Sequence, residues 1–201
     1  MEKYLIRIFT LEKRVILLLF LVISSEQLIC SVHNNPFDSL SISIQLIQNI
    51  NRNIFHDFYE PRNGIKTSIT TPFYWGDIQG SIQVVPYYNK GQSDADFTGI
   101  EPNLKWGKQL YLSDKLRWFN GGGIGWYIFY FSDEIVVGKI ESELSTSYTS
   151  QLSLLVHKKI SLSFEINKDT IFTYKKIDLV YISIGINYFT KTPDWVKLLL
   201  K

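Results

Sequence analysis

The sequence is poor in the residues that build metal and redox sites. It contains one cysteine, Cys30, and three histidines among 201 residues. A single cysteine excludes a disulfide within the chain, and the sequence has neither paired-cysteine spacing nor the two-histidine helix motif of zinc enzymes. Gly121–Gly123 is not followed by the Gly-Lys-Ser/Thr of a phosphate-binding loop. We therefore expect no metal ion and no other cofactor.

Strong charge of either sign is also lacking. The chain has 21 basic and 19 acidic residues, a formal net charge of +2, which gives no electrostatic footprint for nucleic acid. Long apolar runs are scarce, and the mean hydropathy is +0.00. Since a membrane-spanning helix needs about 20 apolar residues, these values argue against a helical membrane protein.

The N-terminus has the pattern of an export signal. Four basic residues (Lys3, Arg7, Lys13 and Arg14) precede the apolar run Val15–Ile23. This order predicts a signal peptide over residues 1–30, with cleavage between Ser24 and Ser31. A transmembrane anchor is the alternative, but the run falls well short of a span. Cys30 could carry a lipid, although Gln27-Leu28-Ile29 lacks the small residues of a lipoprotein signal; both states of Cys30 stay open.

What the sequence has instead is aromatic residues, 15% of the total, and hydrophobicity that alternates with a period of two. In Lys139–Val156, apolar positions such as Leu144 and Leu152 share one face, while Glu143 and Gln151 share the other. Such alternation indicates a strand with one apolar and one polar face. The segment is longer than the usual soluble strand of about 5–6 residues.

Seven further segments show the same pattern, which predicts an all-β chain of eight antiparallel strands in an up-and-down barrel, residues 31–189. The composition of its polar face, described below, makes this a transmembrane barrel. The predicted strands are Ser39–Gln48, Ile65–Phe73, Ile78–Tyr88, Phe97–Trp106, Lys115–Phe131, Lys139–Val156, Ile160–Lys168 and Lys176–Phe189. Residues 47–60 also fit a short amphipathic helix. Pro86 and Pro102 are the main objection, because a closed barrel offers no free edge for a residue without an N–H.

Alternation alone does not distinguish a soluble barrel from a membrane barrel, but the polar face does. It is rich in Ser, Thr, Gln and Gly and holds few charges of both signs, unlike most soluble surfaces. We therefore predict that this face lines a polar lumen, plugged by its own side chains and by paired charges. The predicted network comprises Lys66, Lys105, Lys115 and Arg117 with Glu101, Glu141, Glu143 and Glu165.

Several segments carry a resemblance: GGGIGWYIFY (121–130), TPFYWG (71–76) and the late TPDW (192–195). The chain resembles small outer-membrane β-barrel proteins of Gram-negative bacteria, in particular a poorly characterised Bacteroidetes-type set. The resemblance implies an outer-membrane location, contact with outer-membrane lipid and insertion by the barrel-assembly machinery, and it transfers no catalytic residues. One departure is that twelve residues follow the aromatic pair Tyr188-Phe189. This tail, residues 190–201, is predicted as a short helix beginning near Thr192 and Pro193, or as a frayed end.

Three functions are compatible with these observations. The predicted outer loops (about 49–63, 89–95, 132–138 and 169–175) are short, which favours a structural or envelope-integrity role over a receptor or adhesin. A lipid-modifying enzyme is the second hypothesis, because His56 has a neighbouring carboxylate, Asp57, and could act as a general base. A soluble periplasmic barrel that binds an apolar ligand, as lipocalins do, is the third. The sequence favours the first and predicts no enzyme.

Overall fold

The computed structural model describes residues 36–91, 95–132 and 140–199, the side chains of 198 and 199 excepted. The predicted signal peptide and Cys30 lie outside the described residues. None of the helices within those ranges is long and apolar enough to cross a bilayer.

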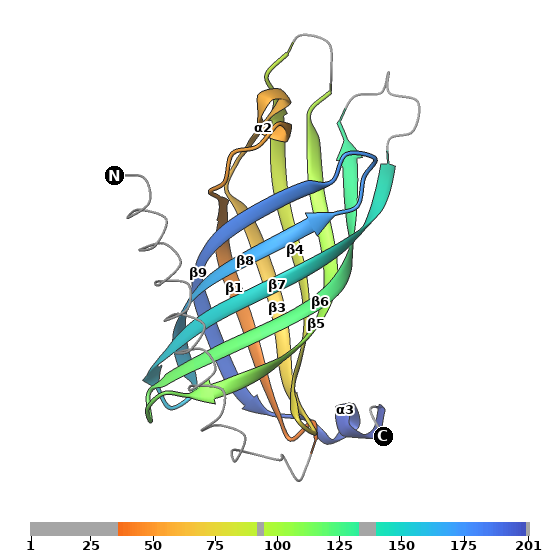
Figure 1. Cartoon of the computed structure of the whole chain (residues 1–201). Helices are drawn as coiled ribbons and strands as arrows, with labels where there is room; N and C mark the ends of the chain where they lie inside the picture. Colours follow the sequence, from red (N-terminus) through yellow and green to blue (C-terminus); the bar gives the residue numbers. More distant parts are fainter. Residues whose placement is uncertain (1–35, 92–94, 133–139, 200–201) are drawn as a thin grey trace, which may run out of the picture. The chain divides into compact units, whose positions relative to one another are not determined.

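Eight long strands form one closed antiparallel barrel (Figure 1). They are β1 (Ser39–Asn49), β3 (Gly64–Phe73), β4 (Gly76–Asn89), β5 (Phe97–Tyr111), β6 (Leu116–Phe131), β7 (Ile140–His157), β8 (Ile160–Ile171) and β9 (Ile177–Lys191). Each strand pairs with the next along the chain, and β9 closes the ring by pairing with β1 from Ser39↔Lys191 to Asn49↔Tyr181. The predicted fold class is confirmed, and each of the eight predicted segments forms a strand.

The ambiguous region after β1 contains both predicted structures. The strand continues to Asn49, and a single helical turn, α2 (Phe55–Phe58), then leads into the short strand β2 (Tyr59–Pro61). The predicted C-terminal helix is α3 (Asp194–Leu199). Its Lys197 forms an ion pair of 3.1 Å with Asp38, and the Thr192 N–H donates to the Asp38 carbonyl. The segment after β9 is therefore fastened to the residue that precedes β1.

The barrel has two different ends. At what we call the terminal end, β1 begins, β9 ends, and three tight turns connect β3 to β4, β5 to β6 and β7 to β8. At the opposite end, called the loop end, longer connections join the strands, and one of them carries α2 (Figure 1).

The barrel accommodates both prolines without a change of strand order. Pro86 lies where β4 changes partner, since β4 pairs with β3 up to Val84 and with β2 from Tyr87 onward. Pro102 lies in a gap of the β5–β6 ladder between Ile100↔Ile128 and Asn103↔Gly125, and the register is the same on both sides of the gap. Each proline thus lies at a position where its strand pairs with only one of its two neighbours. This answers the objection that a closed barrel has no free edge for a residue without an N–H.

The side chains are arranged inside out compared with a soluble barrel. Along β1, Ile44 and Leu46 are 64% and 68% exposed on the outer wall, whereas Ser43 and Gln45 are buried in the lumen. The outer wall carries the same kind of residue on the other strands, among them Ile69, Ile82, Leu104, Trp126, Leu144, Leu152, Phe164 and Ile186. An apolar outer wall around a polar interior is the arrangement of a barrel whose solvent is lipid.

A charge placed on the outer wall tests this arrangement. Ile44→Arg, near the middle of β1, is expected to lower the free energy of unfolding in a bilayer by about 2–4 kcal/mol, because lipid cannot solvate the guanidinium. Urea titration in phospholipid vesicles measures the change. Tyr174→Arg is the control, since Tyr174 is fully exposed in the β8–β9 loop and its replacement should be neutral. Equal effects of the two variants would show that Ile44 faces water.

Candidate functional site

The centre of the lumen holds a layer of buried charges. Four of the eight residues of the predicted network lie in it, namely Lys66, Glu101, Lys105 and Glu165, and each is at most 1% exposed. Lys66 of β3 forms an ion pair with Glu165 of β8, across the barrel. The Lys105 ammonium donates hydrogen bonds to Thr149 Oγ1 (2.6 Å) and Asn167 Oδ1 (2.9 Å). These contacts tie together β3, β5, β7 and β8, which are not all neighbours in the sheet.

A fifth charged residue, Asp169, joins this layer and was missed by the sequence analysis. Gln83 bridges two carboxylates, because its amide group donates to both Glu101 and Asp169. The amide of Asn167 also donates to both Asp169 oxygens at 2.7 Å. Glu165, Asn167 and Asp169 continue a period of two, and the predicted strand ended at Lys168, one residue before Asp169.

The other four predicted network residues lie away from the charged layer. Lys115 is exposed in the turn before β6, and Glu141 is exposed at the start of β7. Glu143 is half-buried nearby, while the Arg117 guanidinium lies over the rings of Tyr111 and Phe189 at the terminal end. The reason is geometric: the period of two gives the face on which a side chain lies, but not its height along the strand.

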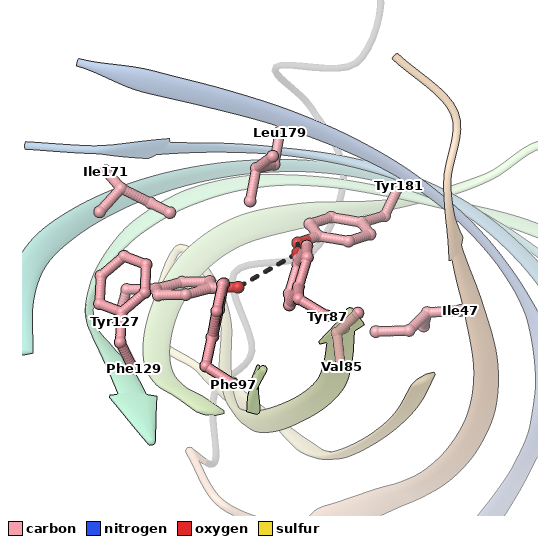
Figure 2. Close-up of a cluster of buried hydrophobic side chains, with 9 residues drawn as sticks. All are labelled: Ile47, Val85, Tyr87, Phe97, Tyr127, Phe129, Ile171, Leu179 and Tyr181. Carbon is pink, nitrogen blue, oxygen red and sulfur yellow. Dashed lines mark hydrogen bonds between the residues drawn. The ribbon is translucent and has the colours of Figure 1, made fainter. Parts of the chain in front are cut away.

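Above the charged layer, towards the loop end, an apolar cluster fills the lumen (Figure 2). We call it the aromatic plug. It consists of Ile47, Val85, Tyr87, Phe97, Tyr127, Phe129, Ile171, Leu179 and Tyr181. The hydroxyl groups of its three tyrosines are hydrogen-bonded to one another. The Tyr87 hydroxyl lies 2.6 Å from that of Tyr181 and accepts a hydrogen bond from that of Tyr127 at 3.2 Å.

The plug depends on one glycine. A Cβ atom on Gly99 of β5 would lie 2.1 Å from the Tyr127 hydroxyl oxygen, so any larger residue at this position would displace Tyr127.

The sequence analysis predicted a lumen filled by polar side chains and missed the aromatic plug. Runs such as VVPYY (84–88) and GWYIFYF (125–131) are apolar on both faces and therefore show no alternation.

The helix α2 covers the aromatic plug at the loop end. The Phe55 ring packs against Tyr87 and Phe97, with centroids 5.5 and 6.0 Å apart, and Tyr59 packs against Phe97 at 4.9 Å. Lys90 holds this cover in place, since its ammonium donates to the His56 carbonyl (2.7 Å) and pairs with Glu60 at 2.8 Å. Hydrogen bonding by Lys90 lowers the pKa of the Glu60 carboxyl.

The terminal half of the lumen contains small polar side chains. Ser43 and Ser68 bond to each other at 2.7 Å, and the Asn187 amide donates to Ser153 and Ser161. A cavity of about 30 Å³ remains among these residues, Arg117 and Phe119, which is room for one or two water molecules. Among the described residues, side chains therefore fill the lumen at several heights.

His56 is buried within the cover and bonded to asparagines. Nδ1 accepts from the Asn53 N–H at 3.2 Å and lies 2.8 Å from Asn53 Oδ1, and Nε2 lies 2.9 Å from Asn49 Oδ1. Burial, with the charges of Arg52 and Lys90, lowers the pKa of His56. Within the described ranges, no hydrogen bond links His56 to a serine or a carboxylate, and Asp57 is exposed. The arrangement that a general base needs is not formed here.

The apolar outer wall and the polar, self-filled lumen together define the fold of a small transmembrane β-barrel. The fold is similar to that of the attachment invasion locus protein Ail of Yersinia pestis, solved in complex with the heparin analogue sucrose octasulfate. The TM-score is 0.51, the identity is 13%, and the match covers 76% of this chain and 99% of Ail.

Two other solved structures match with lower scores. Neisserial surface protein A has a TM-score of 0.49 at 9% identity, and the match covers 76% of this chain and 96% of that one. The N-terminal β-barrel domain of Pseudomonas aeruginosa OprF also scores 0.49, at 8% identity and covering 77% and 100%. No protein-family model and no curated protein matches the sequence.

The buried ion pair gives a quantitative prediction. Lys66→Met is expected to lower the free energy of unfolding by about 3–5 kcal/mol, because the Glu165 charge would stay buried without its partner. The double variant Lys66→Met with Glu165→Gln should recover most of this loss. Urea titration of the four proteins of this double-mutant cycle, in vesicles, measures the coupling.

An exposed ion pair provides the control for that cycle. Lys168 and Asp178 are 3.9 Å apart and mostly solvated, so Lys168→Met should cost below about 1 kcal/mol. If Lys66→Met cost as little as Lys168→Met, the buried layer would not stabilise the barrel.

The cover over the plug should loosen in acid. Since the pKa of His56 is lower in the fold than its ordinary value near 6.5, the folded cover favours the neutral imidazole. Its stabilisation is complete above about pH 6.5 and is lost as the pH falls from there through the folded pKa. Hydrogen exchange of the His56 and Asp57 amides, corrected for intrinsic rates, should show falling protection between pH 7.5 and 5. His56→Gln should remove this pH dependence; if it persists, another group is responsible.

Proposed function

We propose that this protein is an integral outer-membrane β-barrel with a closed lumen and a structural role in the cell envelope. The observation that carries the proposal is the inside-out arrangement, with an apolar outer wall around buried Gln, Ser, Lys and Glu side chains. A soluble lipocalin-like barrel would need the opposite arrangement, because it keeps an apolar cavity inside and a polar surface outside.

The location in the outer membrane is supported by two features of different kinds. The predicted signal peptide would carry the chain out of the cytoplasm, and closed barrels of this kind are typical of bacterial outer membranes. Insertion by the barrel-assembly machinery and contact with outer-membrane lipid follow from this location. Membership of a Bacteroidetes-type set stays a prediction from the TPFYWG and TPDW segments.

The structural role follows from what the lumen and loops provide. In the part of the chain that the structure describes, the aromatic plug and the charged layer fill the lumen, which disfavours transport through the barrel. Of the two loop-end connections that the structure describes in full, the longer one, residues 50–63, folds over the plug instead of extending a recognition surface. That the protein is not an enzyme remains a prediction, and the bonding of His56 to asparagines supports it.

Fractionation of a producing strain tests the location. The full chain should sediment with outer membranes, require detergent for extraction and migrate differently on gels before and after boiling. In planar bilayers it should give no steady conductance. Extraction without detergent would contradict the proposal and favour the soluble ligand-binding alternative.

Deletion of the gene tests the role. A strain without the protein should leak periplasmic enzymes or become sensitive to detergent, and the wild-type chain should restore it. His56→Gln should restore it equally, since the proposed role needs no catalysis. Failure of His56→Gln, with a normal amount of barrel in the membrane, would favour the lipid-modifying enzyme instead.

A further inference from the structure

One arginine at the terminal end of the lumen lacks an anionic partner. Arg117 of β6 is half-buried, and its guanidinium lies 5.2 Å from the centre of the Tyr111 ring and 4.7 Å from that of Phe189. Its Nε is buried without a hydrogen-bond partner, and it takes part in none of the ion pairs among the described residues. Contacts with aromatic rings stabilise the charge but leave the N–H donors of a guanidinium unbonded.

Two hydroxyl groups close to Arg117 are also available as donors. Ser153 of β7 faces Arg117 in the ladder, and Thr70 of β3 lines the same small cavity. Ser153 Oγ accepts a hydrogen bond from the Asn187 amide (3.1 Å), and Thr70 Oγ1 accepts one from the Gln79 amide (3.2 Å). Neither hydroxyl donates to a group in the part of the chain that the structure describes, so each keeps its proton for a ligand. We call Arg117, Thr70 and Ser153 the mouth site.

The cavity beside these donors indicates the size and the charge of a ligand. Its volume of about 30 Å³ holds about two water-sized atoms, which matches the two oxygens of a carboxylate and is small for the four oxygens of a phosphate. Arg117 is the charged residue of the lining, which includes no Asp or Glu among the described side chains. Asn187 Oδ1 is an unpartnered acceptor in the same lining, so water is the competing occupant.

We infer that the mouth site binds a carboxylate group that enters the barrel from its terminal end. The Arg117 guanidinium pairs with the carboxylate through charge-assisted hydrogen bonds, and the hydroxyls of Thr70 and Ser153 donate to its oxygens. The inference deepens the proposed function and rests on it for the side of the membrane, since short turns mark the periplasmic end of such barrels. Two sources supply a carboxylate there: a small free acid, or the end of a peptide chain, which would tether the barrel to a periplasmic structure.

Two-dimensional NMR of the full chain, folded in detergent micelles, tests the inference through the Arg117 Nε–H signal, which Arg117→Lys identifies by its loss. Acetate and the peptide N-acetyl-Ala-Ala should shift this signal to saturation. The C-terminal amide of the same peptide should not, because it carries no charge. If the peptide binds at least about tenfold more tightly than acetate, which corresponds to about 1.4 kcal/mol, the site recognises a chain end; equal affinities assign it to a free acid.

Variants show whether the donors of the mouth site bind the carboxylate, with the Ser153 backbone amide as the reporter. Arg117→Gln should weaken acetate binding by at least about tenfold. Ser153→Ala should weaken it by about tenfold, because one hydrogen bond to a charged group is lost. Arg62→Gln is the matched control. Arg62 also lies over a tyrosine ring, that of Tyr88 at 5.0 Å, but it is exposed at the loop end, so its replacement should change nothing.

The outcomes separate this inference from the proposed function. A signal that responds to neither acetate nor the peptide would leave water as the occupant and overturn the inference, and so would equal losses in Arg117→Gln and Arg62→Gln. Inorganic phosphate that binds more tightly than acetate would overturn the choice of a carboxylate. Gel mobility before and after boiling shows that each variant is folded. Flotation with phospholipid vesicles reports the membrane location independently, and a chain that does not float would contradict that location whatever the NMR result.

Discussion

The need to satisfy every backbone hydrogen bond in an apolar solvent governs this structure. Lipid offers no partner for a free N–H or carbonyl, so a sheet can span a bilayer only when its edges meet. Here β9 and β1 meet over eleven residue pairs. The two prolines within strands show how strict the requirement is, since Pro86 and Pro102 occur where one neighbouring strand makes no ladder pair at their position.

Closure of the ring creates a second requirement, because every other side chain then points into a confined interior. The interior is filled in three layers: aromatic at the loop end, charged in the centre, and small and polar at the terminal end. In the central layer, Lys66, Lys105, Glu101, Glu165 and Asp169 bond to one another or to amides and hydroxyls. The layer is not saturated, since Glu165 Oε2 and Gln83 Oε1 are buried without a hydrogen-bond partner among the described residues; each polar atom that does find a partner offsets part of the cost of its burial.

The sequence predicted the barrel because the side chains along each strand alternate between two environments, the lipid outside the barrel and the polar lumen inside it. It placed Leu144 and Leu152 outside and Lys66 and Glu165 inside, as found. It failed where that signal is missing or incomplete. Tyr87 and Tyr127 stand in runs that are apolar on both faces, and Lys115 and Glu141 have the inward parity but lie too close to the strand ends to be enclosed.

The seam between β1 and β9, where these two strands pair and close the ring, also sets the order in which the molecule can fold. These strands are contributed by opposite ends of the described chain, whereas the other seams join strands that are consecutive or nearly so. Pairing between distant segments is slow, because the chain loses the most entropy when its ends are brought together. The hairpins can therefore form early, but the ring must wait for its last strand. Until then both of its edges are open, and the contact of Lys197 with Asp38 beside the seam can help to hold them together.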